Sequence, residues 1–225
     1  MVEILYKSKN AVVIYKEPGI PSQSDPSGDP DAMTLTSEHL RALGENHNLW
    51  LIHRLDRVVG GLLVFARNKK TAAVLSEYVK DRLITKEYYA VVEGDAESCT
   101  LENFLYKDER AGKSFVIDKE RSGAKLARLS YATLATAETE KGKRSLIYVT
   151  LDTGRFHQIR AQLSHKGHPI SGDGKYGSHD NKAKKIALMS SHLDIKLPGE
   201  QINVRRLPDR EAYPWSLFAD DDYKM

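Results

Sequence analysis

The fold is decided by residues 53–68, which read HRLDRVVGGLLVFARN. No ionisable side chain lies between Arg57 and Arg67, and two glycines lead into residues 62–66, which have the length and apolar composition of a buried strand. Asp56 therefore stands at the mouth of a strand, beside Leu55. Burial among apolar neighbours disfavours the charged form of a carboxyl group unless a cation lies close to it. We expect an arginine from elsewhere in the chain to supply that cation.

The best source of this arginine is residues 153–167, which read TGRFHQIRAQLSHKG. Residues 157–166 have the composition of a helix, and Gly167 closes it. Arg160 would then project from a rigid element. We predict that Arg160 pairs with Asp56.

A third segment, residues 85–94, reads TKEYYAVVEG. In order, the three segments resemble the catalytic motifs of the RluA-type pseudouridine synthases of the RsuA/RluA superfamily, which read roughly HRLDxxTSGLLLxAK, KxYxAxVxG and TGRTHQIRxHLxxxGHPIxGDxxYG. Residues 153–177, TGRFHQIRAQLSHKGHPISGDGKYG, echo the last motif along its length. Residues 11–23, AVVIYKEPGIPSQ, are similar to the opening strand and KPxGxP turn of the family. The resemblance extends to about residue 193.

The resemblance implies an enzyme that isomerises uridine to pseudouridine in RNA, without a cofactor or a metal. Position by position, it implies that Asp56 is the catalytic aspartate, that Arg160 pairs with it, and that Tyr88 packs on the base and is a candidate for C5 deprotonation. Side chains alternate along a strand, so Tyr89 faces the other way and is structural. Substrate or RNA contacts are expected from four further residues: Arg54, Arg155, His157 and Gln158.

Two places depart from the family pattern. Val58, Val59 and Gly60 precede Gly61 where the family has a small polar pair, and Phe156 replaces a threonine. The first change removes hydroxyl groups that could bond the loop, and Gly60 adds backbone freedom. The proposed chemical groups stay in place, so we expect activity.

The order of predicted elements indicates an α+β fold with a mostly antiparallel sheet, because strands and helices segregate rather than alternate. The family resemblance implies a central mixed sheet split by a basic cleft and flanked by helices. Helices are predicted at residues 36–43, ending before Gly44, and after Asn68, where apolar Ala72, Leu75, Val79 and Leu83 fall at helical spacing. Strands are predicted at residues 11–15, 62–66, 88–92, 114–117, 126–134 and 145–151.

We expect a single bilobed catalytic domain over residues 1–225. Residues 22–31, SQSDPSGDPD, form a turn-rich and flexible loop that could cover the cleft, and residues 219–225 form an acidic tail. Only 52 residues precede the first motif, and the opening strand and turn use them, so no S4 RNA-binding domain is expected.

Composition indicates a cytoplasmic globular protein. Hydrophobic residues make up 40% of the chain and charged residues 29%, and no apolar run approaches the length of a membrane span. The N-terminus lacks the features of a secretory signal. Cys99 is the only cysteine, which excludes an internal disulfide and suits a reducing compartment.

Charge is unevenly distributed along the chain. The net charge is only +3, yet residues 141–206 hold 13 Lys and Arg against 5 Asp and Glu. One basic face fits a polyanion, because neutralised phosphates release counterions. We expect ribosomal or transfer RNA as the partner, and a monomer that binds neither metal nor membrane.

Alternatives to the enzyme interpretation start from the same residues. Taken alone, Asp56 and Arg160 would be a structural ion pair, and Tyr88 a core residue. The same fold without turnover would be a catalytically silent RNA-binding protein, and an unrelated hydrolase could use Asp56 and His157. An Asp56→Asn variant separates the enzyme, which would lose isomerisation but largely keep its RNA affinity, from the silent RNA-binding protein, and a hydrolase would release free uracil.

Two other patterns are decoys. Residues 172–177, GDGKYG, formally fit a dinucleotide-binding GxGxxG, but no βαβ unit surrounds them. Zinc ligation by His165, His168, Asp173, His179 and His192 would need more regular spacing than these residues have.

Overall fold

The computed structural model describes residues 2–117 and 119–223. Its contacts divide the chain into two compact units. Unit 1 is formed by Met1–Lys86 and Met189–Arg206, and unit 2 by Glu87–Leu188 and Leu207–Met225.

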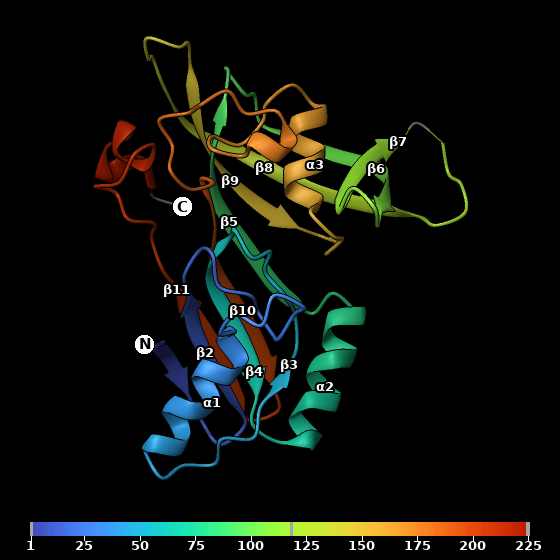
Figure 1. Ribbon diagram of the computed structural model, residues 1–225, viewed down its shortest axis with the longest axis vertical. Helices are drawn as coiled ribbons and strands as arrows, with labels where there is room; N and C mark the ends of the chain where they lie inside the picture. Colours follow the sequence, from blue (N-terminus) through green and yellow to red (C-terminus); the bar gives the residue numbers. More distant parts are fainter. Residues whose placement is uncertain (1, 118, 224–225) are drawn as a thin grey trace. The chain divides into compact units, whose positions relative to one another are not determined.

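The sheet of unit 1 has the strand order β1-β2-β4-β10, with β3 paired to β4 and β11 paired to β10 (Figure 1). Strands β2 and β4 are antiparallel, whereas β10 runs parallel to β4 and pairs Met189 with Gly60. The strand predicted at residues 11–15 is β2, and the one at 62–66 is β4. The bounds are β1 (Glu3–Lys7), β2 (Ala11–Lys16), β3 (Trp50–Leu51), β4 (Gly60–Ala66), β10 (Leu188–Leu197) and β11 (Glu200–Arg205).

Strand β4 is the centre of this unit, and all seven of its residues are buried. It has paired strands on both edges, which leaves its backbone no access to water, and its apolar side chains fill the core on both faces. Buried Val13 from β2 and Leu193 from β10 belong to the same core cluster as Val64 from β4.

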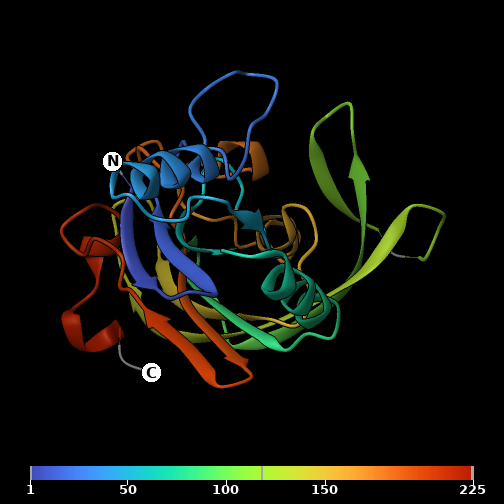
Figure 2. The same cartoon turned by 90° about the horizontal axis from the view of Figure 1, so that it is seen from below.

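Two helices belong to unit 1, α1 (Ala32–Ala42) and α2 (Lys69–Lys80). Figures 1 and 2 show α1 beside β2. Asp31 caps α1 by accepting a hydrogen bond from the Thr34 amide, so this helix begins four residues before the predicted start at 36.

The second helix confirms the capping role of Asn68, whose side chain accepts a hydrogen bond from the Thr71 amide at 2.8 Å. Leu75 is fully buried, as its helical spacing predicts. Leu83 does not follow the pattern, because the helix ends at Lys80 and Leu83 is 56% exposed.

The sheet of unit 2 has the order β5-β9-β8-β6-β7, and the pairs within it that are given by register are antiparallel. The four strands predicted between residues 88 and 151 are confirmed. β5 begins in unit 1 and continues into unit 2. The bounds are β5 (Ile84–Glu93), β6 (Cys99–Asp108), β7 (Lys113–Ile117), β8 (Ala124–Ala137) and β9 (Arg144–Leu151).

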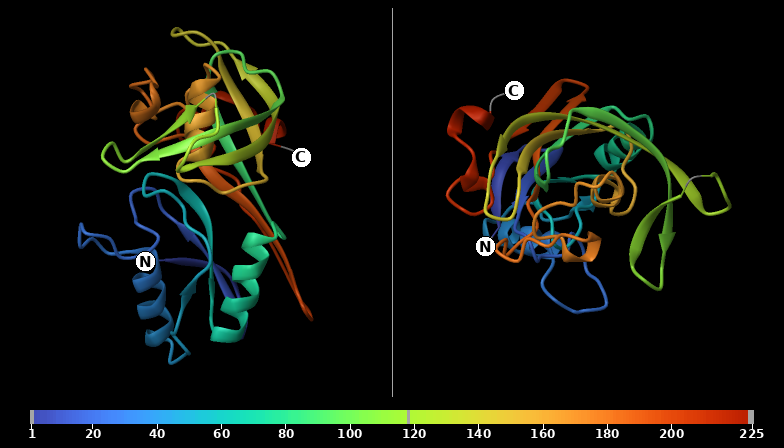
Figure 3. Two further views of the ribbon diagram at one scale, coloured as in Figure 1. Left: turned by 90° about the vertical axis from the view of Figure 1, so that its right-hand side faces the viewer. Right: turned by 90° about the horizontal axis from the view of Figure 1, so that it is seen from above.

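One face of the unit 2 sheet is covered by α3 (Gln158–His165), which contacts β6 and β7 (Figure 3). Ala161 of the helix and Tyr176 pack with Leu105 and Ala127 of the sheet. The predicted helix at 157–166 is therefore confirmed. His157 is its N-cap, and Gly167 follows the last turn with φ 93°.

The opposite face of this sheet is covered at one end by the C-terminal segment. The Tyr89 hydroxyl donates a hydrogen bond to the Tyr223 carbonyl at 2.6 Å, and the ring of Tyr89 contacts that of Tyr148 edge-on at 4.8 Å. Buried Tyr223 closes a short 3-10 helix, Asp220–Tyr223, in the predicted acidic tail.

The α+β class is confirmed, with a mixed and mostly antiparallel sheet flanked by helices. No helix in the described part of the chain combines the length and the apolar composition that crossing a membrane requires.

Candidate active site

Main-chain hydrogen bonds hold the Asp56 loop of unit 1. The Val59 amide donates to the Asp56 carbonyl at 3.0 Å, which makes a turn at the start of β4. The Gly19 amide donates to the carbonyl of Arg57 at 2.7 Å. The Ser22 hydroxyl accepts a hydrogen bond from the Leu55 amide and donates one to the Leu55 carbonyl. Asp56 itself is half-buried. The conformation of this loop is therefore fixed by backbone groups on both sides of the carboxylate.

Lys16 is a fully buried lysine and lies under the same loop. Its Nζ donates to three carbonyls, those of Glu17 at 3.1 Å, Ile20 at 2.8 Å and Arg57 at 3.2 Å. Burial lowers the pKa of Lys16 to about 8, and the charge of Asp56 opposes that shift. The ammonium group is thus charged at neutral pH. Its hydrogen bonds connect the turn that contains Glu17 and Ile20 to the Asp56 loop, which contains Arg57.

Arg57 attaches the predicted flexible loop, residues 22–31, to the Asp56 loop. Its Nε donates to the Gly19 carbonyl at 3.0 Å and its Nη1 to the Ser27 hydroxyl at 3.1 Å, and it forms ion pairs with Asp25 and Asp29. These groups are exposed, so each contact contributes little stability. The flexibility of the loop stays a prediction.

Gly60 and Gly61 are required by space. A Cβ on Gly60 would lie 2.9 Å from the Pro18 ring, and one on Gly61, where φ is 121°, would lie 2.2 Å from the Ser190 carbonyl oxygen. Gly60 does not have a positive φ. The departure from the family motif at 60 therefore makes room for Pro18, and does not serve the backbone freedom that we expected from the sequence.

His53 and Lys86 bring the first motif and the tyrosine motif together within unit 1. Burial, with a smaller contribution from the Lys86 charge, lowers the pKa of His53 to about 3. Burial also lowers the pKa of Lys86. His53 is consequently neutral at physiological pH, and its Nε2 accepts a hydrogen bond from the Val64 amide at 3.4 Å. Arg54, by contrast, is exposed.

Arg160 of unit 2 is fixed by side chains. Only 4% of it is exposed, and it grips Asp173 with two hydrogen bonds, Nε to Oδ2 at 2.7 Å and Nη2 to Oδ1 at 2.9 Å. A bidentate pair of this kind fixes the plane of the guanidinium group. The same group lies 4.9 Å from the centre of the Tyr176 ring.

Tyr176 connects the groups around Arg160 and is a site residue that sequence reasoning missed. Its hydroxyl lies 3.0 Å from His157 Nδ1 and accepts a hydrogen bond from the Ser114 amide at 2.8 Å. His157 has a left-handed backbone, with φ 52°, and its ring stacks on Phe156 at 3.8 Å. The tyrosine of the GDGKYG turn, inside the last motif, was the available signal.

Gln158 holds the turn that precedes α3. It is 3% exposed, and its Oε1 accepts hydrogen bonds from the Thr153 hydroxyl at 2.8 Å and the Arg155 amide at 3.0 Å. Its Nε2 donates to the Arg128 carbonyl at 3.0 Å. These bonds use the amide for structure, and its predicted RNA contact stays a prediction. The side chain of Arg155 is exposed, and its Nε donates to the Leu126 carbonyl.

Strand register places Tyr88 on the face of the unit 2 sheet that carries α3. Directly paired residues lie on the same face, and Tyr88 pairs with Val149, which pairs with Tyr131. Two-residue alternation along β8 takes this face from Tyr131 to Ala127, which packs with α3. Tyr89 occupies the opposite face, as predicted. Tyr88 therefore shares a face with the helix of Arg160.

The described residues of each unit thus contain part of the predicted set. Asp56 and Arg54 belong to unit 1, and Tyr88, Arg155, His157, Gln158 and Arg160 belong to unit 2. The pairing of Asp56 with Arg160 stays a prediction. No three His, Cys, Asp or Glu side chains among the residues described are grouped so that they could hold a metal ion.

Comparisons with known proteins agree on one family. A family model for RNA pseudouridylate synthase matches residues 10–165. Ribosomal large subunit pseudouridine synthase D of Borreliella burgdorferi is 33% identical over 231 residues, which cover 99% of this chain and 69% of that protein. The tRNA pseudouridine synthase C of Haemophilus influenzae is 30% identical over 204 residues, 86% of this chain and 83% of that protein.

A solved structure shares the fold. Human RNA Pseudouridylate Synthase Domain Containing 1 superposes with a TM-score of 0.78 at 23% identity, covering 96% of this chain and 86% of that chain. The family match includes the segments of Asp56, Tyr88 and Arg160. The chain therefore belongs to the RNA pseudouridylate synthase family, the enzymes that isomerise uridine to pseudouridine in RNA.

Proposed function

We propose that this enzyme isomerises specific uridines in ribosomal or transfer RNA, with Asp56 at the ribose, Arg160 paired with Asp56, and Tyr88 against the base. Family membership supports the reaction. The position of Tyr88 on the α3 face is the observation that supports the roles most directly, because it separates Tyr88 from its neighbour Tyr89. The substrate class comes from relatives named for ribosomal and for transfer RNA.

The reaction breaks the bond from ribose C1′ to uracil N1, turns the detached base, and joins C1′ to C5. The proton on C5 leaves and N1 gains one, so the net composition is unchanged. Asp56 either attacks C1′ or removes the C2′ proton to give a glycal. A neighbouring arginine keeps that carboxylate ionised in both routes. The base must first leave its stack, because the duplex hides the ribose face.

The other predicted residues bind RNA or support the site in this proposal. Exposed Arg54 and Arg155 bind phosphates, for which a guanidinium group has the matching geometry. His157 keeps Tyr176 in place next to Arg160 through its 3.0 Å hydrogen bond. We place the enzyme in the cytoplasm as a monomer that uses no cofactor.

Mapping pseudouridine across total RNA tests this function and identifies the target together. RNA from cells with the gene, without it, and complemented with Asp56→Asn is compared. We expect one or a few sites to lose pseudouridine without the gene and to stay unmodified with Asp56→Asn. Complementation with Asp81→Asn, an exposed aspartate of the same unit, is the control and restores them. The same pseudouridine sites in the RNA from all four kinds of cell would contradict the proposal.

The two routes are separated by RNA that carries deuterium at C2′ of the target uridine. A primary isotope effect on single-turnover isomerisation supports the glycal route. Its absence supports attack at C1′.

A further inference from the structure

Unit 2 carries an exposed aromatic face on the side of β6, β7 and β8 that is opposite α3. Strand register sets Phe104 between Ile117 and Leu126, and it sets Tyr106 next to Phe115. Phe115 and Leu126 are each 42% exposed, and the other three are half-buried. Leu105 and Ala127, on the reverse side, pack with α3. We call these five exposed and half-buried residues the aromatic face.

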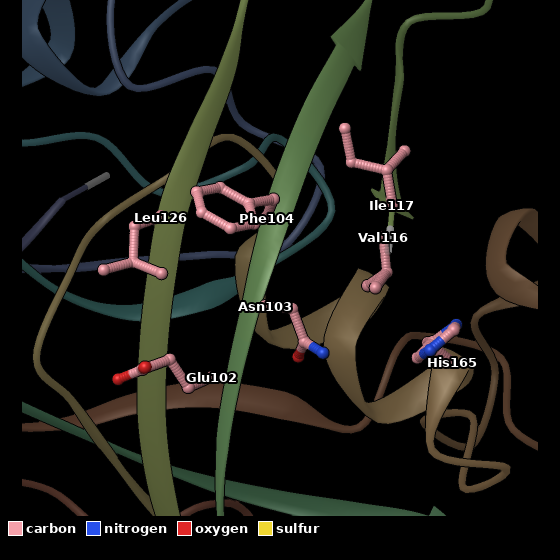
Figure 4. A pocket seen from close by; sticks show the side chains of 7 residues that line it. All are labelled: Glu102, Asn103, Phe104, Val116, Ile117, Leu126 and His165. Carbon is pink, nitrogen blue, oxygen red and sulfur yellow. The ribbon is translucent and has the colours of Figure 1, made fainter. Parts of the chain in front are cut away.

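A hollow of about 320 Å³ adjoins the aromatic face (Figure 4). Phe104 and Leu126 lie next to one another on neighbouring strands in this view. The lining of the hollow also includes Ile117 and Glu102 on this side of the sheet, and Asn103, Val116 and His165 on the side of α3. Glu102 and Asn103 offer hydrogen-bonding groups, and the Asn103 Oδ1 accepts a hydrogen bond from Gln162 Nε2 at 2.8 Å. The volume lies at the small end of the range for ligand sites, and it has both an aromatic wall and polar groups.

Cations lie over the aromatic rings. The Arg121 guanidinium carbon is 4.0 Å from the centre of the Tyr106 ring, and Lys113 Nζ is 5.4 Å from that of Phe115. Within the described residues, no carboxylate pairs with either of them. Residues 113–128 carry five Lys and Arg against two Asp and Glu. The segment therefore combines ring surface with positive charge.

The carboxylates on β6 and its turn have partners already. Glu102 pairs with Arg128 at 3.4 Å, and Glu109 pairs with Lys107 at 2.7 Å. The Asp108 carboxylate accepts a hydrogen bond from the Ala111 amide. These contacts reduce the repulsion that an incoming polyanion would meet.

Lys113 connects the aromatic face to the surroundings of Arg160. Its Nζ lies 4.6 Å from the centre of the Tyr176 ring as well as near Phe115. Tyr176 also contacts the guanidinium group of Arg160. A strand of RNA near Arg160 therefore has a continuous basic and aromatic path around the edge strand β7.

We propose that the aromatic face binds a single-stranded segment of the substrate RNA, which flanks the uridine to be modified. Bases stack on Phe104, Tyr106 and Phe115, and phosphates lie near Arg121 and Lys113. Stacking on aromatic side chains is tolerant of sequence, and arginine adds cation–π attraction. This surface rests on the proposed function, since it serves an enzyme that acts on RNA. An apolar face could instead join two copies of the chain, but the cations over its rings favour a polyanion.

The test uses the full chain and a fluorescein-labelled oligouridylate of twelve nucleotides, with binding followed by anisotropy. A Phe104→Ala/Tyr106→Ala double variant is expected to bind roughly tenfold or more weakly, because each stacked base contributes measurably. Tyr106→Phe keeps the ring and is expected to bind like the wild type, whereas Tyr106→Leu is expected to bind more weakly. Leu83→Ala, which removes an exposed apolar side chain of unit 1, is the matched control.

A second readout does not depend on a substitution. Oligouridylate containing 4-thiouridine is crosslinked to the wild type, and the modified peptides are mapped by mass spectrometry. We expect crosslinks on residues 104–117. Crosslinks confined to other segments overturn the proposal.

Further outcomes decide between the proposals. Unchanged affinity in the double variant overturns the aromatic face as an RNA site, as does a changed oligomeric state with unchanged RNA affinity. Pseudouridine formation by the wild type is measured separately. If it is normal while the variants bind RNA unchanged, only the aromatic-face proposal fails. If the wild type forms no pseudouridine in any RNA, the proposed function fails whatever the binding result.

Discussion

The two units hold their charged residues by different means. In unit 1 the loop of Asp56 is held by main-chain groups, including the Arg57 carbonyl that accepts from Lys16. In unit 2 the guanidinium group of Arg160 is held by the side chains of Asp173 and Tyr176. A loop held through its backbone tolerates changes of side chain. This explains why Val58 and Val59 can occupy the loop after Asp56 and Arg57. A group held by side chains depends on the identity of each partner.

The largest expected effect comes from breaking the buried pair of unit 2. Asp173→Ala removes the bidentate carboxylate from the buried guanidinium group of Arg160, and breaking a buried pair costs about 3 to 5 kcal/mol. Asp152→Ala removes a surface carboxylate that pairs with Arg128 at 3.0 Å and is expected to cost less than about 1 kcal/mol. Urea unfolding measures both. Equal losses in the two variants would contradict the account.

Backbone contact in unit 1 is tested by Gly61→Ala. The added Cβ meets the Ser190 backbone on β10, and the positive φ adds strain, so we expect a loss of about 3 kcal/mol. Gly60→Ala, the neighbouring control, meets the Pro18 ring and is expected to cost about 1 to 2 kcal/mol. The order of the two unfolding free energies is the measurement, and the reverse order would refute the spatial argument.

Lys16→Met tests how the Asp56 loop is held, because it removes a buried side chain that donates to the Arg57 carbonyl. Three carbonyls lose their donor while a buried charge is also removed, so we expect a net loss of about 2 kcal/mol. Isomerisation should fall about tenfold, since small displacements of a catalytic group cost rate. Lys70→Met, on the exposed surface of α2, is the control. Full activity in Lys16→Met would show that the loop holds itself.

The smallest effect is a pH dependence of the free energy of unfolding, which arises from His53 in unit 1. The pKa of His53 is about 3 when folded and about 6.5 when unfolded. The unfolded chain therefore binds a proton first, and the contribution of His53 is present above pH 6.5 and is lost as pH falls towards 3. Between pH 7 and 5 the wild type should lose about 1 to 2 kcal/mol more than His53→Gln. Urea titrations at the two pH values measure these losses. An equal loss of unfolding free energy in the wild type and in His53→Gln would exclude this role.

Sequence reasoning succeeds where local pattern decides. Asn68 caps α2, Gly167 closes α3, and alternation along β5 separates Tyr88 from Tyr89. It also gives the α+β class, because the order of strands and helices is a local property. The start of α1 is missed because Asp31 sits in a turn-rich run that looks like loop.

The remainder depends on contacts between distant segments. Strand β10 runs parallel to β4, although well over a hundred residues separate them. The sequence of β10 does not indicate that it pairs with β4. Lys16 and Tyr176 look like ordinary members of their motifs. Their roles follow from what surrounds them in the fold, three carbonyls in one case and a histidine and an arginine in the other.

Tritium release tests the central claim, that Asp56 is the catalytic carboxylate, most directly. RNA labelled at C5 of uridine loses tritium to water only when the base is reattached through C5. The account predicts release by the wild type and by Asp81→Asn, and no detectable release by Asp56→Asn, with RNA affinity within about twofold of the wild type. Release by Asp56→Asn at a rate within about tenfold of the wild type would contradict it.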